Sequence, residues 1–131
     1  MTVVLDAWAV MALYEDHPCG DDVEAAIDSA EAVMSSINLG EVLYTLERDH
    51  GLEQASMLVE QVRAVTSVED PDWDLVLRAA HIKAAGGISY ADSYCVATAQ
   101  RHEAPLYTGD PEILALSHLV ELVDLREASG R

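Results

Sequence analysis

Four carboxylates in this sequence occupy positions that a parallel sheet would bring close together. They are Asp6, Glu41, Asp92 and Asp110. Two of them end or directly follow short apolar runs, and the other two fall in the first turns of expected helices. All four are therefore predicted at the edge of a parallel sheet where its strands end, which is where such folds place their sites. Carboxylates with no histidine or thiol among them select hard cations, so Mg²⁺ or Mn²⁺ is the expected ligand.

The chemistry expected of this group is hydrolysis of a phosphodiester. Converging carboxylates repel each other strongly unless a cation lies between them. A cation held there polarises a phosphate oxygen and activates water as the nucleophile. It also bridges an acidic pocket to an anionic backbone without help from lysine or arginine.

Helix capping is the competing interpretation of each acid taken singly. Asn38 and Ser89 precede Glu41 and Asp92 by three residues, the spacing of a capping box. The other two acids would each cap a helix that begins at the next residue. We prefer the metal site because Asn38 and Ser89 are expected to supply the caps, which leaves both acids free to point elsewhere.

Strands are expected to alternate with helices along the chain, which implies right-handed crossovers. Expected strands cover Val3–Leu5, Val33–Ile37, Thr66–Glu69, Pro105–Thr108 and Leu119–Leu125. Expected helices start near Ala7, Asp21, Asn38, Leu52, Pro71, Tyr90 and Asp110, the last one ending near Ser117. With no repeat or linker in the sequence, we predict a single domain over residues 1–131. Its fold class is α/β, a three-layer α/β/α sandwich with a central, mainly parallel sheet.

The charge balance is strongly acidic. Seven lysines and arginines stand against 24 aspartates and glutamates, which gives a formal net charge of −17. The usual basic nucleic-acid-binding face is therefore excluded. Two interpretations remain open, namely a surface adapted for solubility or salt, and a cation site that is combined with a basic protein partner.

The sequence predicts a cytoplasmic protein without a membrane span. No apolar run approaches the roughly 18 residues that a membrane helix needs. The first ten residues contain an acid and no basic residue, unlike a secretory signal. Cys19 and Cys95 have no zinc-type spacing, and Cys95 is expected to be a buried thiol.

At these motifs the sequence resembles the PIN-domain family and, within it, the VapC-like toxins of toxin–antitoxin pairs. The resemblance spans nearly the whole chain, through four segments in order. These segments are Val3–Ala7, Ser36–Tyr44, Ser89–Ala99 and Leu106–Asp110. They are similar to the family's opening strand and first acid, its glutamate segment, its third-acid helix, and its strand that ends in a threonine and the fourth acid.

The resemblance implies a ribonuclease that uses Mg²⁺ or Mn²⁺ and acts on an RNA substrate. In that interpretation Asp6, Glu41 and Asp92 are the principal metal ligands, and Asp110 is a further ligand or supports them. Thr108 would orient Asp110 or a phosphate, although an ordinary strand threonine is an equal alternative. The resemblance also implies a homodimer and a small antitoxin, and a basic antitoxin segment would suit the acidic surface.

Some positions depart from the family pattern. Ala7 and Trp8 stand where members often carry serine or threonine, and Trp8 is expected in the core or at a dimer contact. Glu112 is expected at the surface, although it would also be placed to add a fifth carboxylate.

Three other function classes are alternatives to the ribonuclease. One is a PIN-like binding module with weak or no catalysis that acts through a protein partner, as the low basic content suggests. A phosphatase is disfavoured because no second acid stands two residues after Asp6. A receiver domain is disfavoured because no lysine follows a late strand.

Overall fold

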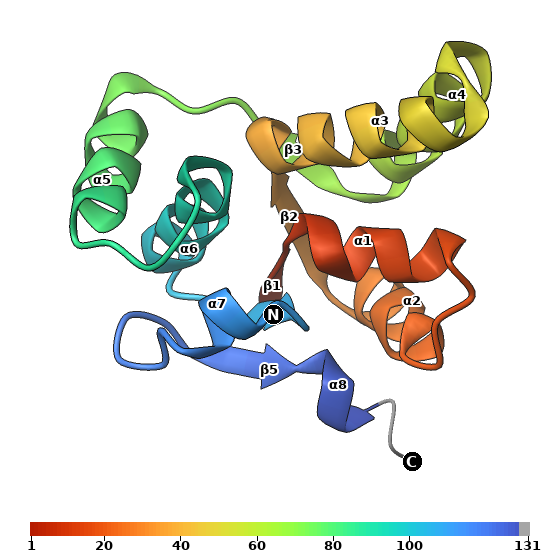
Figure 1. The fold of residues 1–131 in the computed structure, drawn as a ribbon. Helices are drawn as coiled ribbons and strands as arrows, with labels where there is room; N and C mark the ends of the chain where they lie inside the picture. The colour runs from red at the N-terminus through yellow and green to blue at the C-terminus, as the bar shows by residue number, and fades with distance from the viewer. Residues whose placement is uncertain (129–131) are drawn as a thin grey trace.

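The structure is a computed structural model, and it describes residues 1–128. Its fold is built on a five-stranded sheet in which every pair of neighbouring strands is parallel (Figure 1). The strands lie in the order β3-β2-β1-β4-β5. Their bounds are β1 Thr2–Leu5, β2 Glu31–Ser35, β3 Ser67–Glu69, β4 Leu106–Thr108 and β5 Leu122–Asp124. The prediction of a mainly parallel central sheet is confirmed.

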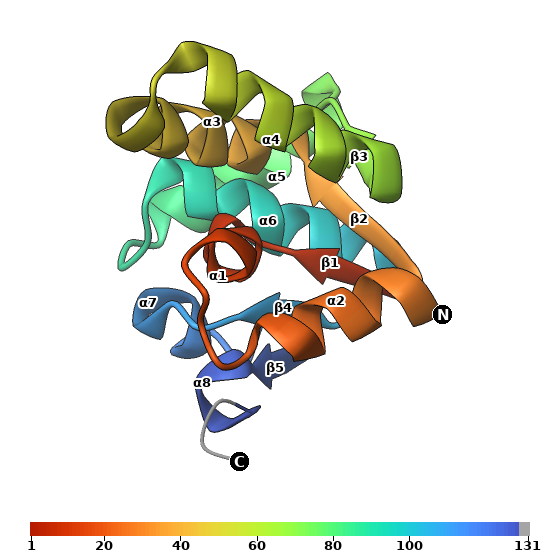
Figure 2. The ribbon, with the colours of Figure 1, turned by 90° about the vertical axis from the view of Figure 1, so that its right-hand side faces the viewer.

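Helices cover both faces of this sheet, as Figures 1 and 2 show. Successive residues of a strand point to opposite faces, so Val3 and Leu5 join the core beneath the first four helices, whereas Val4 packs with α5 and α6. The expected three-layer α/β/α sandwich is therefore confirmed. The helices are α1 Ala7–Tyr14, α2 Gly20–Ser29, α3 Ser36–His50, α4 Leu52–Val65, α5 Trp73–Ala84, α6 Tyr90–His102, α7 Pro111–Leu114 and α8 Leu125–Ala128.

The start of α3 differs from the sequence prediction. Strand β2 ends at Ser35, and the Oγ of Ser35 accepts a hydrogen bond from the backbone N–H of Ile37 at 3.3 Å. Ser35 is thus the N-cap, and the prediction that Asn38 caps this helix is wrong. Because the helix begins earlier, Glu41 lies in its second turn rather than its first.

The last strand is also shorter than predicted. It pairs with β4 only over Leu122–Asp124, because β4 itself is three residues long. Leu125 then turns inward as the buried first residue of α8. Smaller differences at element ends are that α5 begins at Trp73 rather than at Pro71 and that α7 ends at Leu114.

No helix within residues 1–128 is long and apolar enough to cross a membrane. Both cysteines are buried and free, as expected for Cys95.

Gly109 is enclosed by the ring of Trp8. A Cβ added at Gly109 would lie 2.4 Å from two carbons of the indole, which leaves no space for a side chain. Trp8 is half-buried and packs against the core of the α1 side, one of the two places expected for it. The indole therefore fixes the backbone between Thr108 and Asp110, two of the residues singled out in the sequence.

We expect Gly109→Ala to lower the free energy of unfolding by about 1–3 kcal/mol, because the new methyl group overpacks the indole. Gly40→Ala is the matched control, since Gly40 is exposed in α3 with no atom within 4 Å of an added Cβ. That change should stabilise the helix by about 0.5–1 kcal/mol. Urea denaturation of both variants tests the pair, and a Gly109→Ala protein as stable as wild type would contradict the packing described here.

Candidate metal centre

The sheet order places two of the four acids side by side. The chain winds from β1 outward to β2 and β3, and then returns to place β4 against the other side of β1. The crevice at such a reversal, outside the carboxyl ends of the strands, is where open α/β sheets bind ligands. Asp6 directly follows β1, and Asp110 follows β4 after a single glycine.

Asp6 is buried, with 1% of its surface exposed. Its Oδ1 accepts a hydrogen bond from the backbone N–H of Ala9 at 2.8 Å, which caps α1, and its Oδ2 accepts one from the hydroxyl of Thr108. Burial raises the pKa of Asp6 to about 7, and the nearby charges of Asp92 and Asp110 act in the same direction, whereas the two hydrogen bonds oppose the rise. Asp6 is therefore both a helix cap and a member of a carboxylate group.

Thr108 links the ends of the two central strands. Its buried hydroxyl donates to Asp6, and its Oγ1 accepts the backbone N–H of Asp110 at 2.9 Å. The side chain therefore orients the backbone of Asp110, and it also holds the Asp6 carboxylate directly.

Asp92 lies in the first turn of α6, where the Oγ of Ser89 accepts its backbone N–H at 3.1 Å. Burial raises the pKa of Asp92 to about 6, with further contributions from the charges of Asp110 and Glu41. Carboxylate oxygens of Asp92, Asp110 and Glu112 all lie within 4.8 Å of one another. This group of three could hold a metal ion. Glu112 is exposed, which confirms its expected place at the surface, and it also adds a fifth carboxylate to the group.

Glu41 reaches this region from α3 and is half-buried. Its Oε1 accepts a hydrogen bond from Nδ2 of Asn38 at 3.0 Å. The sequence predicts only a capping role for Asn38, because it gives no sign that the amide of this side chain points into the protein. For Glu112, only its position two residues after Asp110 indicated that it could add a fifth carboxylate to the group.

One buried thiol lies close enough to three of the acids to feel their charges. Cys95 lies one turn after Asp92 in α6, and its Sγ donates to the Asp92 carbonyl at 3.0 Å. Burial raises the pKa of Cys95 well above its ordinary value, and the charges of Asp6 and Asp92 add to that effect. Burial among these acids therefore favours the protonated form of the thiol over the thiolate.

The ion pairs of residues 1–128 lie away from these acids. They join Arg63 to Glu60, Arg101 to Asp72, His102 to Glu69 and Arg126 to Asp124. The negative charge of the carboxylate group is therefore not balanced by an ion pair within the described part of the chain.

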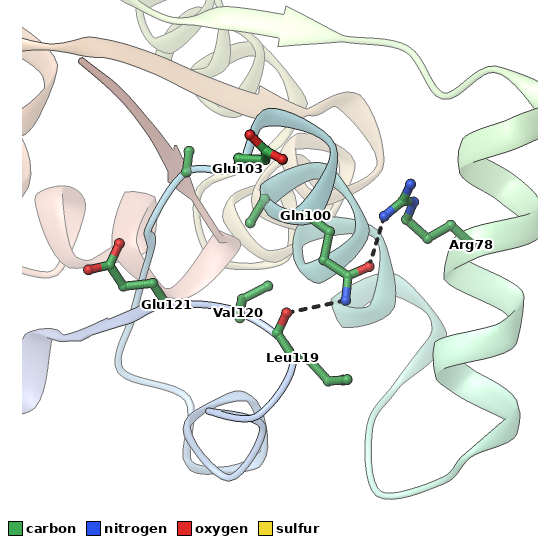
Figure 3. A pocket seen from close by; sticks show the side chains of 8 residues that line it. Arg78, Gln100, Glu103, Leu119, Val120 and Glu121 are labelled. Carbon is green, nitrogen blue, oxygen red and sulfur yellow. Dashed lines mark hydrogen bonds between the residues drawn. The ribbon is translucent and has the colours of Figure 1, made fainter.

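A separate hollow of about 360 Å³ lies near the amino ends of β4 and β5 (Figure 3). There Arg78 donates to Oε1 of Gln100 at 3.3 Å, and Gln100 donates to the carbonyl of Leu119 at 3.3 Å. Glu103 and Glu121 also line it, but none of the acids predicted for the metal site does. The carboxyl edge of the sheet thus remains the candidate centre.

Comparison with known proteins identifies the family. A family model described as PIN domain matches residues 3–119. The chain belongs to the PIN-domain family. This agrees with the resemblance found in the sequence. No match was found among curated proteins.

Solved structures show the same fold at low sequence identity. DNA-bound VapBC from Salmonella typhimurium matches with a TM-score of 0.77 and 17% identity, over 95% of this chain and 98% of that one. VapBC2 from Rickettsia felis, bound to a promoter DNA fragment, gives 0.76 and 16% over the same shares. The sarcin–ricin-loop-cleaving toxin VapC20 from Mycobacterium tuberculosis gives 0.71 and 20%, over 87% of this chain and 94% of that one.

The raised pKa values of Asp6 and Asp92 predict how stability depends on pH in metal-free protein. Between about pH 4 and the folded-state pKa values of about 6 and 7, the folded state binds more protons than the unfolded state. Their contribution to stability is therefore greatest at low pH and is lost as the pH rises through 6 and 7. In EDTA, we expect the free energy of unfolding to fall from about pH 4.5 to about pH 7.5.

Asp92→Asn isolates one part of this effect. The neutral amide removes the charge, so the variant should exceed wild type by about 1–2 kcal/mol near pH 7.5, a figure reduced because Asp92 is only half-buried. Near pH 4.5 the two proteins should differ little. The control is Asp74→Asn, an exposed acid in the first turn of α5. Parallel pH profiles for wild type and Asp92→Asn would show that the carboxylates do not repel each other as described.

Proposed function

We propose that this protein is a metal-dependent ribonuclease that hydrolyses RNA phosphodiester bonds and serves as the toxin of a toxin–antitoxin pair. The observation that carries the proposal is the group of carboxylates at the carboxyl edge of the sheet, with Asp92, Asp110 and Glu112 within 4.8 Å of one another. Membership of the PIN-domain family supports it. So do the structural relatives, one of which is described as a toxin that cleaves the sarcin–ricin loop.

The donor set fits a hard divalent cation. Every candidate ligand is a carboxylate oxygen, the type that Mg²⁺ and Mn²⁺ prefer. The raised pKa values of Asp6 and Asp92 mean that the ionised forms of these carboxyl groups are destabilised by burial and by neighbouring charges. A bound cation would offset that destabilisation. In this proposal Asp6, Glu41, Asp92 and Asp110 hold Mg²⁺ or Mn²⁺, with Glu112 at the rim.

The residues of the chain would orient the reaction around that ion. When bound, the cation supplies polarisation of a phosphate oxygen and a lowered pKa of bound water. Thr108 holds the Asp6 carboxylate from one side, and the N-terminal turn of α1 holds it from the other. Asp110 is fixed through its own backbone N–H and by its cap on α7, where its Oδ1 accepts the N–H of Glu112 at 2.8 Å. Carboxylates held in this way would keep a bound cation in a fixed place at the edge of the sheet.

The charge of the protein favours a basic protein partner. A net charge of −17 attracts a basic antitoxin segment over long range, and the association should weaken as salt rises. The relatives from Salmonella and Rickettsia are VapBC structures bound to DNA. We further infer a homodimer, on the strength of the family resemblance, and a cytoplasmic location, on the strength of the sequence of the first ten residues.

The second candidate function is a PIN-like binding module with weak or no catalysis. It is favoured by the scarcity of lysine and arginine, seven in the whole chain, to hold an RNA backbone.

Calorimetric titration with Mn²⁺ near neutral pH tests the metal site. Wild type should bind, and Asp92→Asn should bind at least about 10-fold more weakly because it loses a ligand charge. Asp74→Asn should bind like wild type. Cleavage of structured RNA in Mn²⁺ should be lost in Asp6→Asn and Asp92→Asn but retained in Asp74→Asn.

The outcomes separate the candidates. Binding without cleavage of any RNA would favour the binding module. Equal binding by wild type and Asp92→Asn would place the metal elsewhere on the acidic surface. If Mn²⁺ bound neither protein, the four acids would be explained as helix caps and surface charges.

A further inference from the structure

The side chain of Asn38 joins the two helices that carry Glu41 and Asp92. Asn38 lies in the first turn of α3 and is fully buried, with 0% of its surface exposed. Its Nδ2 donates to Oε1 of Glu41 at 3.0 Å and to the backbone carbonyl of Ala91 at 2.9 Å. Ala91 directly precedes Asp92 in the first turn of α6. One amide nitrogen thus contacts both a candidate ligand and the backbone next to another.

The orientation of this amide follows from its partners. Both partners of Nδ2 are acceptors, and a rotated amide would place its oxygen against a carboxylate and a carbonyl. In the observed orientation Oδ1 of Asn38 is buried and has no hydrogen-bond partner within the described residues. Buried polar atoms are nearly always paired, and an unpaired one calls for an explanation. Apolar packing alone therefore does not account for an asparagine at this position.

Few side chains could replace these two donations. A serine or threonine hydroxyl has one hydrogen to give, and an aspartate has none at neutral pH. A lysine has donors enough, but it would bring a charge into a fully buried position. The amide alone offers two N–H groups from one neutral nitrogen of this size, and a hydrogen bond to a carboxylate is stronger than one between neutral groups.

We propose that Asn38 is a positioning residue of the metal centre, which holds the Glu41 carboxylate in fixed register with the first turn of α6, so that Glu41 and Asp92 face the same cation. This inference rests on the proposed function. Side chains that orient metal ligands commonly change metal affinity when they are removed. Here the bond also crosses between helices, so its loss would release Glu41 from α6 and from Asp92.

A double-mutant cycle read by Mn²⁺ affinity tests the inference. The proteins are wild type, Asn38→Ala, Glu41→Gln and the double variant, titrated by calorimetry at neutral pH. Asn38→Ala should weaken Mn²⁺ binding about 10-fold in wild type. In the Glu41→Gln background it should cost only about 2-fold, because the ligand that it positions is already lost. Asn38→Leu keeps the branched shape of the side chain and removes both donations. If Asn38→Ala folds poorly, Asn38→Leu takes its place in the cycle, with the same losses expected.

Thr98→Val is the matched control. Thr98 is also fully buried, and its hydroxyl donates to the Tyr94 carbonyl at 2.7 Å within α6. Its loss removes a buried hydrogen bond without touching the carboxylates, so stability should fall while Mn²⁺ affinity stays as in wild type.

Each result decides the matter. Tenfold losses in both backgrounds, or folded Asn38 variants that bind Mn²⁺ like wild type, would overturn the positioning role and leave the metal site intact. A wild-type protein that does not bind Mn²⁺ would overturn the proposed function, and this inference with it.

Discussion

The hydroxyl of Thr108 and the carboxylate of Asp6 make the contact on which the centre depends. They stand at the ends of β4 and β1, the two strands between which the sheet reverses its winding. The backbone N–H of Asp6 also donates to the Tyr107 carbonyl at 3.4 Å, so the two strand ends are joined by main chain and side chain together. Through Thr108 this connection continues to the backbone of Asp110. The contact therefore fixes two acids that are 104 positions apart in the sequence by the numbering of the chain.

Capping and metal binding are compatible in this arrangement, although the sequence presents them as alternatives. Asp6 caps α1 and Asp110 caps α7. A carboxylate has about four lone-pair sites on its two oxygens, so a backbone N–H occupies only one of them. The cap also restrains the side chain, which reduces the entropy lost when the carboxylate is fixed around a cation. The helix starts thus serve as supports for the acids.

The features that could be predicted from the sequence are those that depend on residues close to each other in the chain. The spacing of apolar residues, the short apolar runs and the order of the acids can all be read from neighbouring residues. These local signals were sufficient to predict the parallel sheet, its layers and the edge at which the acids lie. The cap of α3 was missed because it depends on where β2 stops pairing with β3, at Ser35 opposite Glu69. The hydrogen bonds of Asn38 could not be predicted for the same reason, since its second acceptor, the Ala91 carbonyl, is 53 positions away and is brought close only by the packing of α3 on α6.

The distribution of charge gives the centre its electrostatic character. Residues 1–47, which build β1, α1, α2, β2 and most of α3, contain no lysine or arginine. The acidic edge therefore faces no lysine or arginine from that part of the chain, and its field favours any cation that approaches. A divalent metal and a basic protein segment are attracted by the same potential, whereas an RNA backbone is repelled until that potential is lowered. Under the proposed function, metal binding would thus be a condition for RNA to approach as well as for its cleavage, and a basic partner over the same edge would compete with both.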